Sequence, residues 1–197
     1  MKIGFDVDGV LADFNTRFIN RVIAVTGRDL FPPHPFVIPC WDYPEAFGYS
    51  KKEVSAVWEQ VKKDPLFWRY LHRCSDVPFE RIEALNETWD HDIYFVTSRV
   101  GINCKGQTEE WLRPYIFNPT VLISSHKGLC AQALRLDAYI DDKIENCVDT
   151  APSCWTFILD RPWNQPGAPG WQKLSPAMQQ AITRVVTVGE MLDQIGV

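Results

Sequence analysis

The sequence has 197 residues, of which 46% are hydrophobic and 23% are charged. This composition is typical of a globular protein and excludes a disordered, collagenous or low-complexity chain. The 20 basic and 25 acidic residues give a formal net charge of −5, which is unfavourable for general binding to the DNA or RNA backbone. The length is that of one domain, or of one domain that carries a small insertion.

Membrane association is not predicted, because no apolar run approaches the roughly 20 residues that span a bilayer. The amino-terminal segment Met1–Phe5 is followed at once by an acidic residue, which is not typical of a signal peptide. The six cysteines include no C-x-x-C pair, and a chain of this size does not depend on disulfide bonds for its core. Reduced thiols and a cytoplasmic location are therefore expected.

The first predicted element is a strand over residues 3–5, where a short apolar run ends in the turn-like segment Asp6–Gly9. A helix is predicted after this turn and is expected to end near Gly27. Its apolar residues recur at helical spacing: Phe14, Phe18 and Val22. Residues 28–48 contain five prolines among several aromatic residues, which is typical of an irregular functional loop or an inserted subdomain.

Two further helices are predicted before residue 90. Ser50 and Glu53 form a capping-box pattern at the start of the first helix. Its predicted buried face consists of Val54, Val57, Trp58 and Val61. Asp76 and Pro78 favour the start of the second helix. Its predicted buried stripe consists of Phe79, Ile82, Leu85 and Trp89.

Strands and helices alternate from about residue 91 onwards. Apolar runs predict strands at residues 93–96, 121–123, 138–140 and 155–159. Helices are expected around residues 106–113, after Lys127, after Ser175-Pro176 and over residues 190–195. Continuous apolar strands between helices indicate a parallel sheet covered on both faces. The predicted fold is α/β, with a Rossmann-like core of residues 1–14 and 91–197 and a small, mostly helical cap of residues 15–90 inserted after the first strand.

Polar and ionisable side chains follow four of the predicted strands where each strand ends. These groups are Asp6 and Asp8, Thr97 and Ser98, Ser125 with Lys127, and Asp141 with Asp142. The carboxyl ends of the strands of an open parallel sheet border one crevice, so these groups are expected to converge there. A single aspartate after a strand is more often a helix cap or a turn residue. The conjunction of all four groups, by contrast, has a common chemistry.

The four groups combine crowded carboxylates with hydrogen-bond donors. Four crowded carboxylates raise one another's pKa values, and a hard divalent cation removes the repulsion. Mg²⁺ prefers oxygen ligands and keeps several waters. The hydroxyls of Thr97 and Ser98 and the ammonium of Lys127 are donors suited to phosphoryl oxygens. Carboxylates, Mg²⁺, a hydroxyl and a lysine together describe phosphoryl transfer, in which positioning and charge neutralisation supply most of the catalysis.

These residues resemble a known set of motifs. The string DVDGVLADF, from Asp6 to Phe14, resembles the DxDG(T/V) signature of the haloacid dehalogenase (HAD) superfamily and is similar to the 5′(3′)-deoxyribonucleotidase family in particular. Thr97-Ser98, Lys127 and Asp141-Asp142 resemble the three remaining superfamily motifs, in the expected order. Also similar to the deoxyribonucleotidases are VTS at residues 96–98, YIDD at residues 139–142 and RPWN at residues 161–164. The resemblance extends to about residue 164.

The resemblance implies a role for each motif. Asp6 would be the nucleophile that forms an aspartyl-phosphate. Asp8 would protonate the leaving oxygen and then activate the water that releases phosphate. Mg²⁺ would bind the Asp6 carboxylate, the backbone carbonyl of Asp8 and one residue of the Asp141-Asp142 pair, the other of which would position water or Lys127. A hydroxyl of the Thr97-Ser98 pair and the ammonium of Lys127 would hold the phosphoryl oxygens.

The resemblance also implies that aromatic residues hold a nucleobase. Phe14 occupies the matching place at the end of the first motif. Further candidates, by region, are Trp41, Tyr43, Phe67 and Trp68. Packing within the cap is the alternative role for each of them. Because aromatic stacking tolerates any base, these residues favour a planar-ring substrate without selecting the base.

Two positions depart from the deoxyribonucleotidase pattern. Arg99 follows the Thr97-Ser98 pair where a proline is usual, and Leu71–Cys74 lacks the expected Pro-Gly. Arg99 is interpreted as a solvated surface charge. The alternatives are an extra anion contact or a second phosphate site. These departures concern base and sugar preference and leave the phosphatase chemistry unchanged.

The predicted function is that of a Mg²⁺-dependent phosphoric monoester hydrolase of nucleotide metabolism, acting on nucleoside monophosphates and preferring deoxynucleotides. A sugar phosphate or another small phosphate ester is the alternative substrate. A non-catalytic binding protein on the same scaffold is less favoured, because every catalytic and metal-binding carboxylate is present. The negative net charge disfavours a nucleic-acid polymer as partner. The helices of residues 165–197 are expected to cover the sheet or to form a homodimer contact.

Overall fold

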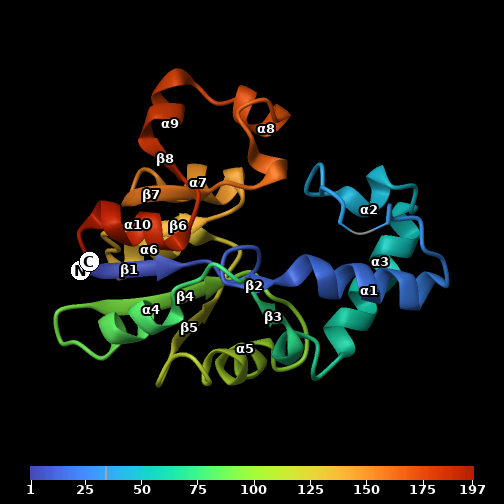
Figure 1. Cartoon of the computed structure of the whole chain (residues 1–197), viewed down its shortest axis with the longest axis horizontal. Coiled ribbons are helices and arrows are strands. Elements are labelled where there is room, and N and C mark those ends of the chain that lie inside the picture. Colours follow the sequence, from blue (N-terminus) through green and yellow to red (C-terminus); the bar gives the residue numbers. More distant parts are fainter. Residues whose placement is uncertain (34) are drawn as a thin grey trace.

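A six-stranded parallel sheet forms the centre of the protein (Figure 1). The computed structural model describes residues 1–33 and 35–197. The strand order is β5-β4-β1-β6-β7-β8, and every neighbouring pair is parallel. The strands are β1 Lys2–Phe5, β4 Asp92–Thr97, β5 Thr120–Ile123, β6 Ala138–Asp141, β7 Trp155–Leu159 and β8 Ile182–Val185.

The first strand, β1, lies in the middle of this sheet between β4 and β6. Ile3 is paired with Ile93 on one side and with Ala138 on the other. Ile3 and Phe5 are fully buried, as expected for a parallel strand covered on both faces. Because all strands run in the same direction, the loops after β1, β4 and β6 leave the sheet at one edge.

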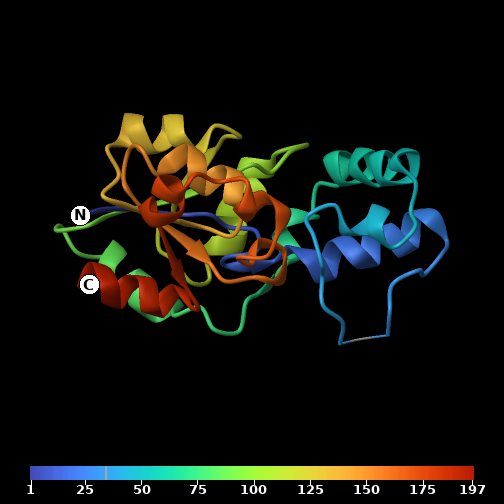
Figure 2. The same ribbon diagram turned by 90° about the horizontal axis from the view of Figure 1, so that it is seen from above.

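Helices cover both faces of the sheet (Figure 2). One face carries α6 Lys127–Leu134 and α7 Ile144–Thr150, and the other carries α4 Phe79–Asn86 and α10 Val188–Ile195. Helix α5, Cys104–Leu112, packs beside β5. Shorter helical segments are η2 Pro162–Asn164, α8 Pro169–Gln172 and α9 Pro176–Ala181.

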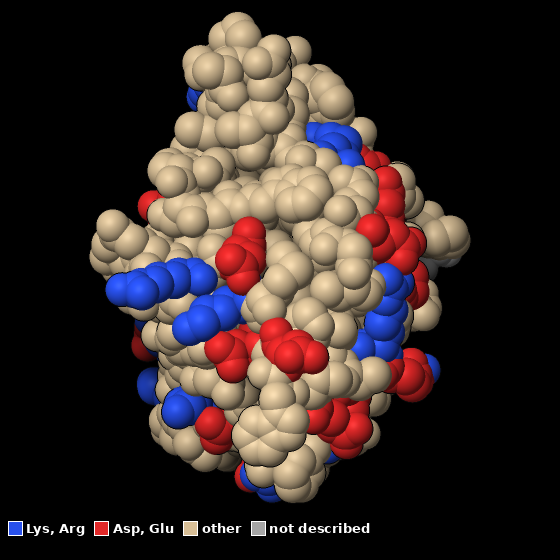
Figure 3. All heavy atoms as spheres, turned by 90° about the vertical axis from the view of Figure 1, so that its left-hand side faces the viewer, with Lys and Arg blue, Asp and Glu red and all other residues tan. Residues whose placement is uncertain are grey.

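Both chain termini lie at the end of the sheet opposite to the loops that follow β1 and β6 (Figure 1). Basic and acidic side chains are interspersed on that face (Figure 3). Within the part of the chain that the structure describes, no helix is long and apolar enough to cross a membrane.

Three helices stand beside the carboxyl ends of the strands and are called the cap below: α1 Phe14–Thr26, α2 Tyr43–Ala46 and α3 Lys51–Lys63. The chain enters the cap through β2, Ala12–Asp13, and returns through η1, Trp68–Tyr70, and β3, His72–Arg73. Strands β2 and β3 form an antiparallel pair, so both crossings lie side by side.

Local signals set the ends of the cap helices. Asp13 caps α1 by accepting a hydrogen bond from the backbone N–H of Thr16 at 3.1 Å. Gly27 ends α1 in the left-handed conformation, with φ of 68°. Ser50 and Glu53 form the complete capping box at the start of α3 that the sequence predicts.

Several elements differ from the sequence predictions, and helix α7 and the short strands β2 and β3 are not predicted at all. Strand β8 is not predicted, because the polar Thr183 and Arg184 interrupt its apolar pattern at the sheet edge. Trp89 is predicted in the buried stripe of α4, but this prediction is wrong, because the helix ends at Asn86 and Trp89 is fully exposed. The fold class is confirmed: a parallel α/β sheet lies between helices, and a helical cap follows the first strand.

Helix α4 lies within the range 15–90 that the sequence assigns to the cap. In the structure it packs against β4 of the sheet, and Phe79 stacks on Tyr115 with ring centroids 4.4 Å apart. The predicted domain boundaries stay a prediction. Within residues 15–90, the helices that lie beside the sheet as the cap are α1, α2 and α3.

Candidate active site

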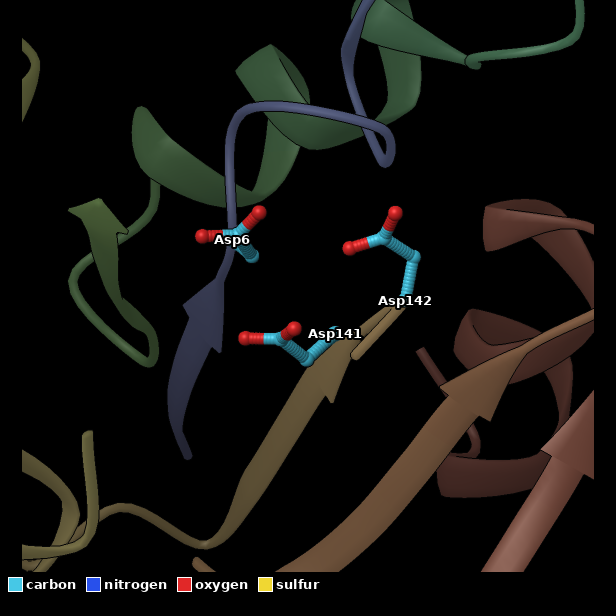
Figure 4. Close-up of side chains that lie close together, drawn as sticks. All are labelled: Asp6, Asp141 and Asp142. Carbon is cyan, nitrogen blue, oxygen red and sulfur yellow. The ribbon is translucent and has the colours of Figure 1, made fainter. Parts of the chain in front are cut away.

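Three aspartates from two neighbouring strands lie close together at the carboxyl edge of the sheet (Figure 4). Asp6 directly follows β1, Asp141 ends β6, and Asp142 is the next residue. One carboxylate oxygen of each lies within 4.8 Å of the other two, and all three residues are buried. The structure therefore brings together the strand ends that the sequence marks, and we call these three residues the acidic cluster.

Lys127 places one positive charge beside the acidic cluster. It is the first residue of α6 and is 1% exposed. Its Nζ donates to Oδ1 of Asp6 and to the backbone carbonyl of Val96, and it lies 3.9 Å from Oδ2 of Asp141. Burial by itself would lower the pKa of Lys127, but the charges of Asp6 and Asp141 raise the pKa above its usual value. The side chain is therefore an ammonium.

Hydrogen bonds from three neighbours fix the carboxylate of Asp141. The backbone N–H of Lys143 donates to Oδ1 at 2.9 Å. Nδ2 of Asn146 lies 3.0 Å from each carboxylate oxygen, and the hydroxyl of Tyr139 donates to Oδ2 at 3.0 Å. With both oxygens bound, this carboxylate has a single well-defined orientation.

Asp142 differs from Asp141 in having a free oxygen. Its Oδ2 is buried and has no hydrogen-bond partner among the described residues. Gly9, with φ of 84°, brings the loop after β1 so close that a Cβ there would lie 2.1 Å from this oxygen. A buried, unpartnered carboxylate oxygen costs free energy unless it is protonated or binds a cation.

The acidic cluster resists full ionisation. Burial raises the pKa of Asp6 to about 7; Lys127 opposes this shift, and the charges of Asp141 and Asp8 add to it. Burial also raises the pKa of Asp142 well above its usual value, and Asp141 and Asp6 add to that shift.

The residues of the acidic cluster fit a divalent cation. Three carboxylates and the ammonium of Lys127 carry three negative charges against one positive charge when all are ionised. The two remaining negative charges equal the charge of one divalent cation, which would also bind the free oxygen of Asp142. The donors are all oxygens, the ligand type that Mg²⁺ prefers.

The carboxylate of Asp8 lies beside the acidic cluster and is bound by Thr97 and Arg99. Thr97 Oγ1 donates to Asp8 Oδ2 at 3.3 Å. Nη2 of Arg99 donates to Oδ1 at 2.8 Å, and its Nε lies 3.2 Å from Oδ1 and 3.0 Å from Oδ2. Arg99 is 2% exposed, so its interpretation as a solvated surface charge is wrong. Ser98 and Val100 on either side are exposed, whereas the side chain of Arg99 is directed inward and is buried against Asp8.

A cavity of 740 Å³ separates the acidic cluster from the cap. This volume lies within the range of small-molecule sites. On the core side it is bordered by Asp6, Asp8, Thr97, Ser98, Arg99, Ser125 and Asp142. Its aromatic residues are Phe14, Phe18, Trp41, Tyr43, Trp58, Trp68 and Trp163. Ser98 is exposed, and its Oγ donates to the backbone carbonyl of Ser124 at 3.0 Å.

Phe67 is not where the sequence predictions place it. It is fully buried and does not line the cavity. Its ring packs edge-on against Trp68, with centroids 4.9 Å apart, and against Phe14 at 6.4 Å. Phe67 therefore lies behind the residues that face the cavity, because the turn into η1 directs neighbouring side chains to opposite sides. The other predicted aromatic residues, Phe14, Trp41, Tyr43 and Trp68, do line it.

Solved structures match this chain over nearly its whole length. A hydrolase of the haloacid dehalogenase-like family from Streptococcus pneumoniae gives a TM-score of 0.60 at 14% identity, covering 98% of this chain and 97% of that chain. A HAD-superfamily hydrolase from Ehrlichia chaffeensis gives a TM-score of 0.54 at 14% identity, and the match covers 98% of this chain and 95% of that chain. The HAD-hydrolase YfnB from Bacillus subtilis, solved bound to magnesium, gives 0.56 at 16% identity, covering 100% and 98%. No protein-family model and no curated protein matches the sequence.

The chain has the haloacid dehalogenase-like fold. At these identities the similarity establishes the architecture, and the reaction has to be inferred from the side chains at the carboxyl edge of the sheet. The acidic cluster, Asp8 and Lys127 all lie at that edge.

Three further residues at this site of the haloacid dehalogenase-like fold are not among the predicted site residues: Tyr139, Asn146 and Trp163. Asn146 lies in α7, in the turn of helix after the Asp141-Asp142 pair, and its position there is the signal that could have indicated it. Trp163 Nε1 donates to the backbone carbonyl of Asp142 at 3.2 Å. Its RPWN segment resembles the deoxyribonucleotidases, but only the structure shows the contact.

Proposed function

We propose that the protein is a Mg²⁺-dependent phosphomonoesterase of the HAD superfamily that hydrolyses nucleoside monophosphates. The observation that carries this proposal is the position of Asp6. Its carboxylate follows the central strand, accepts a hydrogen bond from Lys127, belongs to the acidic cluster and borders a cavity of small-molecule size. The haloacid dehalogenase-like fold of the matched hydrolases supports a hydrolytic reaction.

Asp6 and Asp8 divide the reaction into two displacements. Asp8 carries a proton when the substrate binds. A carboxylate oxygen of Asp6 attacks the phosphorus, the P–O bond to the leaving group breaks, and the carboxyl group of Asp8 gives its proton to the leaving oxygen. A water molecule then attacks the phosphorus of the aspartyl-phosphate and gives a proton to Asp8. The bond between phosphorus and Asp6 breaks, inorganic phosphate leaves, and both carboxyl groups return to their starting states.

Donors around the nucleophile hold the phosphoryl oxygens. Lys127 and the hydroxyls of Thr97-Ser98 serve this role in the proposal. Mg²⁺ would be held by the Asp6 carboxylate, the backbone carbonyl of Asp8 and Asp142, and it would neutralise negative charge at the phosphoryl group. The free Oδ2 of Asp142 supports this residue as the direct ligand, since the oxygens of Asp141 already accept hydrogen bonds.

The cap side of the cavity supports a substrate with a planar ring. Phe14 stacks on Trp58 and on Trp68 with ring centroids 5.9 Å and 5.8 Å apart, and all three rings line the cavity. A nucleobase stacks on such surfaces at about 1–3 kcal/mol per base. We propose deoxynucleoside monophosphates as the preferred class, from the resemblance of the DVDGVLADF string.

A sugar phosphate is the second candidate substrate. Polar side chains of the cap border the same cavity and suit sugar hydroxyl groups: Asn15, Ser55, Glu59 and Lys62. A non-catalytic binding protein is disfavoured by the intact acidic cluster and Lys127.

A phosphate-release assay separates these substrates. Nucleoside 5′- and 3′-monophosphates, ribo and deoxy, are compared with hexose and pentose phosphates at saturating Mg²⁺. We expect the highest kcat/KM among the deoxynucleotides. A clear preference for a sugar phosphate would replace the nucleotide by the second candidate, and activity on no phosphomonoester would contradict the enzymatic proposal.

The cellular location and the oligomeric state of the protein are part of the same proposal. All six cysteines are free. The cytoplasmic location expected from the cysteine pattern of the sequence stays part of the proposal. The homodimer contact expected for the last helices stays a prediction, and gel filtration with light scattering would test it.

A further inference from the structure

Arg99 binds Asp8 in a way that the proposed reaction does not yet use. The side chain of Arg99 is completely buried, and that of Asp8 is 18% exposed. Arg99 bridges both carboxylate oxygens of Asp8, and Thr97 donates to one of them. A guanidinium is a planar, rigid fork of donors, so this contact fixes both the plane and the direction of the carboxylate.

Arg99 is itself held by two helical elements. Its Nη1 donates at 3.0 Å to Oγ1 of Thr108 in α5, and this hydroxyl donates to the backbone carbonyl of Cys104 at 2.7 Å. The indole rings of Trp68 and Trp111 lie 5.0 Å and 5.6 Å from its guanidinium carbon. The position of Asp8 is thus determined by α5 and η1 and not by its own loop alone.

Trp68 connects this arrangement to the cavity. Its ring lines the cavity beside Phe14 and also packs on the guanidinium of Arg99. The backbone N–H of Trp68 donates to Oε1 of Gln107 at 2.9 Å, and its Nε1 donates to the backbone carbonyl of Val100 at 2.9 Å. The wall of the cavity and the orientation of Asp8 therefore depend on the same side chain.

A direct contact between Arg99 and an anion is not favoured by these bonds. Three of its five N–H groups already donate, those of Nε and Nη2 to Asp8 and one of Nη1 to Thr108, and the side chain has no exposed surface. An arginine that binds a substrate phosphate needs donors aimed at the open cavity. The alternatives of an extra anion contact or a second phosphate site are thereby weakened.

We propose that Arg99 is a positioning residue that holds Asp8 as the base for hydrolysis of the aspartyl-phosphate. This inference rests on the proposed function. Arginine can only donate hydrogen bonds, so it presents Asp8 as an acceptor. In this step a water O–H bond breaks, its proton goes to Asp8, the water oxygen bonds to phosphorus, and the bond from phosphorus to Asp6 breaks. Misplacing a base by about 1 Å costs about 100-fold in rate.

The test uses p-nitrophenyl phosphate, whose leaving group departs without a proton donor, so that the first displacement depends little on Asp8. For Arg99→Met at saturating Mg²⁺, we expect kcat to fall by about 10–100-fold. KM should fall by a similar factor, because a slower second step lowers kcat and KM together and leaves kcat/KM within about threefold of the wild type. A stoichiometric burst of p-nitrophenol and a phosphorylated protein in acid-quenched mass spectra should accompany this change.

Three further variants separate positioning from a general structural effect. Arg99→Lys keeps the charge and should recover part of kcat. Thr108→Val removes the acceptor for Nη1 and should give a smaller change in the same direction. Arg81→Met, which removes an ion pair with Asp193 at 2.7 Å outside the cavity, is the matched control and should leave kcat, KM and the burst unchanged.

The inference is overturned if kcat of Arg99→Met equals that of the wild type, or if kcat and kcat/KM fall equally without phosphorylated protein. If thermal unfolding shows that Arg99→Met is not folded, Arg99→Lys and Thr108→Val decide by the same criteria. A wild-type protein that neither hydrolyses phosphomonoesters nor becomes phosphorylated contradicts the proposed function, and this inference falls with it.

Discussion

The cavity has two sides that are built in different ways. On the core side, the segments after β1, β4, β5 and β6 carry charged groups. Asp6 accepts a hydrogen bond from Lys127, Asp8 accepts from Thr97 and Arg99, and Asp141 accepts from the backbone N–H of Lys143. On the cap side, α1, α3 and η1 contribute stacked aromatic rings such as Phe14, Trp58 and Trp68.

This difference suggests that the core side carries out the proposed reaction and that the cap side selects the substrate. Asp6 and Asp8 are bound by side chains from distant parts of the chain, so a substitution at one of these contacts changes the charge balance of the set. The rings on the cap side contribute to substrate binding through their contact area and shape. Loss of one ring therefore has a smaller effect, and its size depends on the substrate. We therefore expect large effects on kcat from core-side changes and moderate effects on KM from cap-side changes.

The largest effect is expected for Asp6→Asn. The amide keeps the shape of the side chain but cannot form the aspartyl-phosphate, so phosphate release should fall by at least about 10⁴-fold. Thermal stability should not decrease, because a buried carboxylate with a raised pKa is replaced by a neutral group. Asp42→Asn changes an aspartate of the cap side and should retain most of the activity. Near wild-type turnover in Asp6→Asn would contradict the nucleophile assignment.

Removal of the metal ion should have the next largest effect. Excess chelator should lower phosphate release by at least about 10³-fold, since the acidic cluster then lacks the cation that neutralises its charge. Added Mg²⁺ should restore the activity and raise the melting temperature. The melting temperature of Asp142→Asn should respond much less to Mg²⁺. Undiminished activity in excess chelator would show that the acidic cluster works without a cation.

A moderate effect is expected for Phe14→Leu on the cap side. Loss of one stacking surface, at about 1–3 kcal/mol, should raise KM for a nucleotide by about tenfold. KM for a small ester such as glycerol phosphate should change much less. Phe67→Leu is the matched control, because the same substitution is then made behind the cavity wall. Equal changes in KM for both esters would argue against stacking of a base on Phe14.

The smallest effect concerns the stability of the metal-free protein. Burial raises the pKa of Asp6 from its ordinary value of 3.8 to about 7, so the folded protein keeps a proton that the unfolded chain loses. Stability should therefore fall as the pH rises from about 4 to 7 and level off above that. Asp142 contributes in the same direction. Melting temperatures recorded with chelator should show this decline, and Asp6→Asn should flatten it; a melting temperature that rises over this range would contradict the raised pKa.

The core side of the site could be predicted from the sequence because its residues stand directly after apolar strands. Asp6, Thr97 and Asp141 each follow or end a strand, and parallel strands bring such positions to one edge. The role of Arg99 could not be predicted, since its partner Asp8 is distant in the sequence and the surrounding tryptophans come from η1 and α5. On the cap side, Phe67 and Trp68 are neighbours in the sequence, but only Trp68 lines the cavity. Which of the two faces the cavity depends on the backbone direction at η1.

The central position of β1 has a consequence for the biosynthesis of the protein. Strands β4 and β6, which pair with β1, begin at residues 92 and 138. The first strand to be synthesised therefore stays without both partners until most of the polypeptide has been translated. Pairing across such long intervals of chain slows folding. An amino-terminal fragment that stops before Asp141 lacks two of the three carboxylates of the acidic cluster, so the cluster can be completed only late in synthesis.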